Sequence, residues 1–170
     1  MVKEFTQMLR DHGAVEYGRF TLASGEQSTY YIDVKTAITD PDLLARIGAE
    51  VAKITEFDVV AGVAVGGVPI AVATSLMSRR PYAIIRSREK DHGKSGSVIG
   101  DVSGKRVLLV EDVTTSGGSA VFGINALRAA GAEIECVITV VDREQGARER
   151  LREERVNLHA LVIASELIER

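Results

Sequence analysis

Short apolar runs alternate with amphipathic segments along most of the chain, and this alternation restricts the fold more than any other feature. The runs are rich in Val, Ile and Leu and are apolar throughout, which is typical of strands buried on both faces. Helices between such strands act as right-handed crossovers and make the strands parallel. The sequence therefore predicts a three-layer α/β fold with a mostly parallel central sheet. The predicted strands cover residues 59–65, 82–85, 106–110, 134–141 and 159–163.

The helices are predicted from their start and stop signals as well as from periodicity. Asp40 is placed to cap a helix that has Pro41 at its first position, and apolar residues then recur on one face as far as Ile54. Gly131 closes another helix, as glycine commonly does. The predicted helices cover residues 2–12, 41–55, 68–77, 117–130 and 144–155.

The N-terminal part has a different composition. Residues 19–34 mix Thr, Tyr and Gly, which predicts short strands and turns. We expect one domain over residues 1–170, because 45% hydrophobic residues in 170 suffice for a single sizeable core. Within it, residues 1–38 are predicted to form a small cap, here called the hood, and residues 40–165 the α/β core. Residues 93–104, with four Gly and three Ser, are predicted to form a mobile loop.

Composition excludes several classes of protein. The net charge of −3 and pI near 5.7 argue against a general nucleic-acid binder, which needs a broad basic face. No apolar stretch is long enough for a membrane span, and no targeting signal is recognisable, so we expect an untargeted cytoplasmic protein. Cys136, the only cysteine, lies in an apolar run, which predicts a buried strand position rather than thiol chemistry.

The most informative segment is VLLVEDVTTSGGSA, residues 107–120, at the end of a predicted strand. Ligands of parallel sheets bind beyond the carboxyl ends of the strands. Gly117 and Gly118 allow backbone N–H groups to approach a phosphate, and the helix that follows presents its positive N-terminus. Hydroxyl groups in the same turn can donate further hydrogen bonds. They belong to Thr114, Thr115, Ser116 and Ser119.

Two adjacent acids, Glu111 and Asp112, precede this turn. Carboxylates repel phosphate but accept hydrogen bonds from the vicinal hydroxyls of a sugar. An ordinary Ser/Thr helix cap would not require the acid pair. The chain has neither GxxxxGK[ST] nor GxGxxG, which disfavours a nucleotide triphosphatase or a dinucleotide-binding fold.

The segment resembles the signature with which type I phosphoribosyltransferases bind phosphoribosyl pyrophosphate (PRPP). The resemblance implies that Glu111 and Asp112 hold the ribose 2- and 3-hydroxyls and that residues 115–119 hold the 5-phosphate. The implied PRPP-binding set also includes Val113 and Thr114 and, outside this segment, Arg86, Lys90 and His92.

Three further segments, and the position of one arginine, resemble features of the orotate phosphoribosyltransferases. The segments are FTLASGEQSTYYID (20–33), GVAVGGVPIA (62–71), similar to a pyrophosphate-binding turn, and the basic run RSREKDHGK (86–94). The arginine is Arg143 in VVDREQGA, directly after a predicted strand. A guanidinium there suits orotate, whose carboxylate and ring carbonyls are acceptors. The resemblance implies that Arg143 and Thr115 contact orotate.

In that family a flexible loop carries Arg, Lys and His to the pyrophosphate, and the matching positions are Arg86, Lys90 and His92. We expect these three residues to be catalytic, with Lys90 foremost, because cations stabilise the departing pyrophosphate. The resemblance also implies Mg²⁺ as cofactor, with no firm protein ligands, and a homodimer in which the loop covers the neighbouring subunit's site. Expected partners are PRPP and orotate, with no nucleic acid and no membrane.

Other interpretations stay open at the level of sequence. The basic run could be a solvated loop, the 20–33 segment a hairpin without ligand contacts, and Arg143 an ion-pair partner of Asp142 or Glu144. Cations that are common in the family are replaced by Ala23, Gly66 and Ser87. A purine phosphoribosyltransferase, or a PRPP-sensing regulator with the same fold, are the alternative functions.

Overall fold

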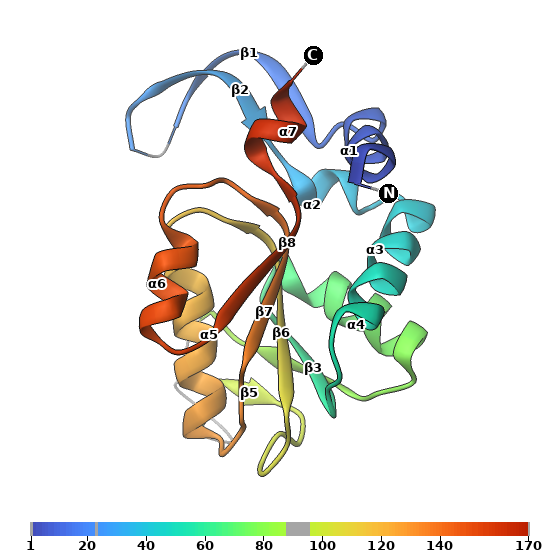
Figure 1. Ribbon diagram of the computed structural model, residues 1–170, viewed down its shortest axis with the longest axis vertical. Coiled ribbons are helices and arrows are strands. Elements are labelled where there is room, and N and C mark those ends of the chain that lie inside the picture. Colours follow the sequence, from blue (N-terminus) through green and yellow to red (C-terminus); the bar gives the residue numbers. More distant parts are fainter. Residues whose placement is uncertain (1, 23, 88–95, 170) are drawn as a thin grey trace.

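A computed structural model, which describes residues 2–22, 24–87 and 96–169, contains a large and a small sheet (Figure 1). The large sheet has six strands in the order β5-β4-β3-β6-β7-β8, and all neighbours are parallel except β4 and β5. This confirms the predicted α/β class with a mostly parallel sheet. The strands are β3 (Val59–Val63), β4 (Tyr82–Ile85), β5 (Val98–Ile99), β6 (Val107–Thr114), β7 (Cys136–Asp142) and β8 (Asn157–Ile163).

Helices cover both faces of this sheet and make the three layers (Figure 1). On one face lie α1 (Val2–Asp11), α3 (Pro41–Ile54) and α4 (Gly67–Ser78), and on the other α5 (Gly118–Ala129) and α6 (Ala147–Glu153). The Asp40 carboxylate accepts hydrogen bonds from the backbone N–H groups of Asp42 and Leu43, as its predicted role as a cap requires.

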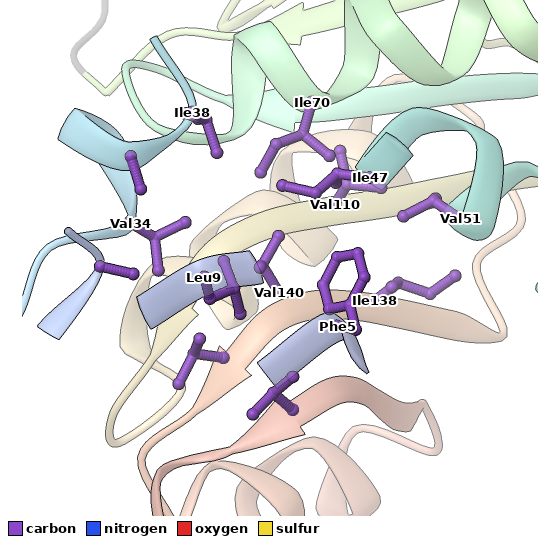
Figure 2. Packing of buried hydrophobic residues seen from close by; sticks show 14 of the residues in the cluster. Phe5, Leu9, Val34, Ile38, Ile47, Val51, Ile70, Val110, Ile138 and Val140 are labelled. Carbon is purple, nitrogen blue, oxygen red and sulfur yellow. The ribbon is translucent and has the colours of Figure 1, made fainter. Parts of the chain in front are cut away.

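The two faces of the central strands belong to two separate hydrophobic clusters. Leu108 and Val110 of β6 point into the cluster with α3 and α4, whereas Val107 and Leu109 point into the cluster with α5. Figure 2 shows the first cluster, in which Val110 and its neighbours on β7 face side chains of α1 and α3. Burial on both faces explains why these strands are apolar throughout.

The hood lies at the carboxyl ends of the core strands (Figure 1). Its strands β1 (Val15–Thr21) and β2 (Gln27–Ile32) form an antiparallel hairpin, followed by the short helix α2 (Val34–Ala37). The Arg10 guanidinium donates hydrogen bonds to the carbonyls of Glu166 and Leu167 in α7 (Ala164–Ile168), at 2.7 and 2.8 Å. The C-terminal helix is thereby tied to the hood.

Several boundaries differ from the predictions. β6 continues four residues past Val110, because it still pairs with β7 there although its pairing with β3 has ended. α6 begins at Ala147 rather than 144, since Gly146 adopts a left-handed φ of 96° just before it. Cys136 lies in a strand as predicted but is only half-buried, and burial raises the pKa of its thiol.

The short elements β5, α2 and α7 were not predicted from the sequence. β5 uses part of the 93–104 stretch, and residues 93–95 of that stretch lie outside the described residues. No helix within the described ranges is long and apolar enough to cross a membrane.

Candidate functional site

The predicted phosphate turn lies at the carboxyl end of β6, where the chain passes into α5. It borders a hollow of about 190 Å³. Gly117 has a left-handed φ of 82°, and a Cβ there would lie only 3.0 Å from the Leu151 side chain, so both the backbone conformation and the tight packing favour glycine. The hollow is lined by Glu111, Val113, Thr114, Thr115, Ser116, Gly117, Gly118, Ser119 and Ala120. The structure thus brings the predicted residues together, apart from Asp112, which faces elsewhere.

Glu111 belongs to the wall of this hollow and is only 4% exposed. Its Oε1 accepts a hydrogen bond of 3.0 Å from the Ser119 hydroxyl at the start of α5. Burial, together with the negative charge of Asp112, raises the pKa of Glu111 to about 8, against the opposing effects of the Ser119 hydrogen bond and Lys35. A buried carboxyl group of this kind favours a neutral state or a partner that donates hydrogen bonds.

Asp112 points to the opposite side of the strand, since successive side chains of a strand alternate in direction. Its Oδ2 lies 3.3 Å from the Nζ of Lys35 in the hood helix α2. The acid pair therefore faces both the phosphate hollow and the hood.

The turn between β3 and α4, which resembles a pyrophosphate-binding turn, depends on close backbone contacts. A Cβ on Gly62 would lie 2.3 Å from the carbonyl oxygen of Gly67, and a Cβ on Gly67 would lie 2.6 Å from that of Val110. A Cβ on Gly66 would lie 2.4 Å from the Asp112 carboxyl carbon. These glycines allow the turn to lie directly against the acid-bearing end of β6.

Arg143 follows β7 next to the phosphate turn. Its backbone N–H donates to the Thr114 carbonyl at 2.9 Å, and the Thr114 hydroxyl donates to Asp142 at 3.2 Å. Asp142 also faces Arg148 at 3.8 Å, and the Glu144 carboxylate accepts from the backbone of Ser165. Within the described chain, Arg143 forms no ion pair with Asp142 or Glu144, and its buried Nε has no hydrogen-bond partner.

Of the predicted catalytic cations, Arg86 is described and lies directly after β4 at the same edge of the sheet. Its guanidinium donates to the Gly96 carbonyl at 3.3 Å, and its backbone N–H donates to Ser97. Lys90 and His92 lie outside the described residues, as does Ala23.

The sequence analysis missed Lys35. Its position depends on Asp33, the last residue of the 20–33 segment, which caps α2 by accepting hydrogen bonds from the backbone and hydroxyl of Thr36. Burial acts to raise the pKa of Asp33, but the Thr36 hydrogen bonds, together with the charge and the backbone N–H of Lys35, lower it overall. The Asp33 to Thr36 spacing is the signal that could have indicated a short helix carrying Lys35.

Comparison with known proteins identifies the family. Residues 36–158 match the phosphoribosyl transferase domain. Orotate phosphoribosyltransferases of Methanoculleus marisnigri and Methanocorpusculum labreanum are 60% and 61% identical to this chain, and each alignment covers 99% of both chains. The crystal structure of Mycobacterium tuberculosis orotate phosphoribosyltransferase in complex with Fe(III) dicitrate superimposes with a TM-score of 0.86 at 32% identity, over 99% of both chains.

The fold and the site thus define a phosphoribosyltransferase with a PRPP-type turn at the end of β6. Within that class, the chain belongs to the orotate phosphoribosyltransferase family.

The raised pKa of Glu111 predicts that the stability of the fold falls as pH rises. Its pKa is about 8 in the folded chain against an ordinary value of 4.5, so the unfolded state binds fewer protons between these values and stability falls as pH rises through this window. Glu111→Gln removes this contribution. We expect the wild type to lose on the order of 5 °C more in Tm than the variant between pH 6 and pH 8. If thermal melts give the same change of Tm with pH for the wild type and for Glu111→Gln, the raised pKa of Glu111 is contradicted.

Proposed function

We propose that the chain transfers the phosphoribosyl group of PRPP to orotate and releases orotidine 5'-monophosphate and pyrophosphate, a step of pyrimidine nucleotide (UMP) biosynthesis. The observation that carries the proposal is the buried acid pair beside a hydroxyl-lined hollow at the carboxyl edge of the sheet. Full-length identity of 60% to a relative named orotate phosphoribosyltransferase supports the choice of base.

PRPP fits the site by the chemistry of its parts. The 5-phosphate takes the turn before α5, where backbone N–H groups, hydroxyls and the helix N-terminus all favour an anion. The ribose hydroxyls donate to Glu111 and Asp112, which supplies the buried carboxyl groups with hydrogen-bond donors. The pyrophosphate then lies toward the turn of residues 64–67 and Arg86.

Orotate takes the space between the phosphate turn and the loop after β7, contacting Thr115 and Arg143. The Arg143 backbone is fixed to Thr114, and its buried Nε has no hydrogen-bond partner in the described chain. A guanidinium held in this way can direct its donors at a carboxylate or ring carbonyl of the base.

Catalysis in this proposal is positional and electrostatic. The bond from the anomeric carbon to pyrophosphate breaks with oxocarbenium character. A ring nitrogen of orotate forms the new bond to that carbon, and its N–H proton passes to water or to the departing pyrophosphate. Arg86, Lys90 and His92 stabilise the charge of the departing pyrophosphate. No covalent nucleophile is needed for this displacement.

Mg²⁺ is the proposed cofactor. In the described ranges no three His, Cys, Asp or Glu side chains gather into a metal site, and the two carboxyl groups of Glu111 and Asp112 face different sides of β6. This fits an ion bound mainly through PRPP oxygens and water, as Mg²⁺ often is with phosphate ligands. When bound, the ion would balance the negative charge of the pyrophosphate.

We further propose a cytoplasmic homodimer of single-domain chains, in which Lys90 and His92 serve the neighbouring subunit's site. The support is the resemblance of the 86–94 run to the family's shared loop. Mixing a Lys90→Ala chain with an Asp112→Ala chain tests the sharing, since one intact site can form in the mixed dimer. Activity that does not recover in the mixture contradicts it.

The first test of the function is pyrophosphate release from PRPP and Mg²⁺ with orotate, uracil, adenine, guanine, hypoxanthine or xanthine in separate reactions. We expect release with orotate alone. Release with a purine would retain the PRPP site and overturn the base pocket. If none of the bases gives pyrophosphate release and the chain binds nucleic acid tightly and in a salt-sensitive manner, the regulator alternative is favoured instead.

Substitutions of an orotate-binding residue and of a pyrophosphate-binding residue should cause different kinetic defects. Arg143→Ala removes charge-assisted hydrogen bonds to the bound base, so the orotate KM should rise about 10- to 100-fold. Lys90→Ala removes a cation that acts on the departing pyrophosphate, so kcat should fall roughly 100-fold with little change in the orotate KM. Steady-state kinetics that give the reverse pattern would overturn these roles.

A further inference from the structure

Lys35 joins the hood to the acid pair across 77 residues of sequence. Its Nζ lies 3.3 Å from the Asp112 Oδ2, and the Asp112 side chain is only 11% exposed, whereas that of Lys35 is 63% exposed. The pair therefore joins a buried carboxylate of the predicted ribose site to an exposed cation of the hood.

Gly66 completes this arrangement from the other side. The Asp112 carboxylate fills the space that a side chain at position 66 would need, with Oδ2 only 2.4 Å from the ideal Cβ position. A longer side chain at this position is incompatible with the observed orientation of Asp112, so position 66 cannot supply a cation in this arrangement. The positive charge next to Asp112 comes from position 35 instead.

The charges around Lys35 are consistent with this role. The negative charge of Asp112 is the main cause that raises the pKa of Lys35, and Asp33 and Tyr31 add to it. The cap at Asp33 fixes the helix that carries Lys35. Lys35 also opposes the raised pKa of Glu111, so this one cation acts on both acids.

We propose that Lys35 is a positioning residue of the PRPP site: it orients the Asp112 carboxylate toward the ribose hydroxyls and supplies, from the hood, the cation that position 66 lacks. The inference rests on the proposed binding of PRPP.

The test compares Lys35→Met and Lys35→Arg with a matched control, Lys53→Met. Lys53 also forms an exposed ion pair, with its Nζ 3.3 Å from Glu50 and its side chain 69% exposed, but it lies on α3 away from the acid pair. We expect Lys35→Met to raise the PRPP KM about tenfold, a loss of about 1.4 kcal/mol. The values of kcat and the orotate KM should change less than about twofold, and Lys35→Arg should restore most of the affinity.

Three results would overturn the proposal: an unchanged PRPP KM in Lys35→Met, no rescue by Lys35→Arg, or an equal rise in Lys53→Met. Calorimetric titration with PRPP separates this inference from the proposed reaction. If the wild type binds PRPP but shows no orotate-dependent release, the reaction is wrong while the PRPP affinities still test Lys35.

A double-mutant cycle tests whether Lys35 acts through Asp112. Lys35→Met should weaken PRPP binding much less in an Asp112→Asn background than in the wild type, because the carboxylate it orients is already lost. Equal losses in both backgrounds would show that Lys35 acts independently and would contradict a positioning role.

Discussion

Two adjacent carboxyl groups are buried at the end of β6, and the rest of the site is arranged around them. Because neighbouring side chains of a strand point to opposite sides, Glu111 reaches the hollow before α5 and Asp112 reaches the hood. Each carboxyl group is largely buried and needs hydrogen-bond donors. Ser119 and Lys35 meet this need in the free chain, and the ribose hydroxyls would meet it in the complex.

The surrounding backbone is shaped by the same constraint. The turn after β3 lies so close to β6 that Gly62, Gly66 and Gly67 have no space for a side chain. Beyond Val110, β6 pairs only with β7, and the turn after β3 lies against the end of β6 at Asp112. The turn after β3, the predicted phosphate turn and the hood helix α2 thus meet around the acid pair at one edge of the sheet.

The core and much of the site were predictable from the sequence, because continuous apolar runs and the EDVTTSGGS segment have few other physical explanations. The helices α2 and α7 were not predicted, because they are too short for a periodic signal. The predicted end of β6 is too early, because the last four residues of the strand mix acids with apolar residues. Lys35 was missed because its role depends on a contact across 77 residues. The close approach of Asp112, which leaves no space for a side chain at Gly66, is likewise visible only in the structure.

Binding of the PRPP ribose by the acid pair can be tested by calorimetric titration of PRPP with Mg²⁺ into the wild type and into the Glu111→Gln/Asp112→Asn double variant. The variant keeps the shape of both side chains but weakens their capacity to accept hydrogen bonds from hydroxyls. We expect an affinity at least about 100-fold lower in the variant, because each hydrogen bond to a charged group contributes roughly 1.5–3 kcal/mol. Equal affinity in a variant that melts as cooperatively as the wild type would contradict it.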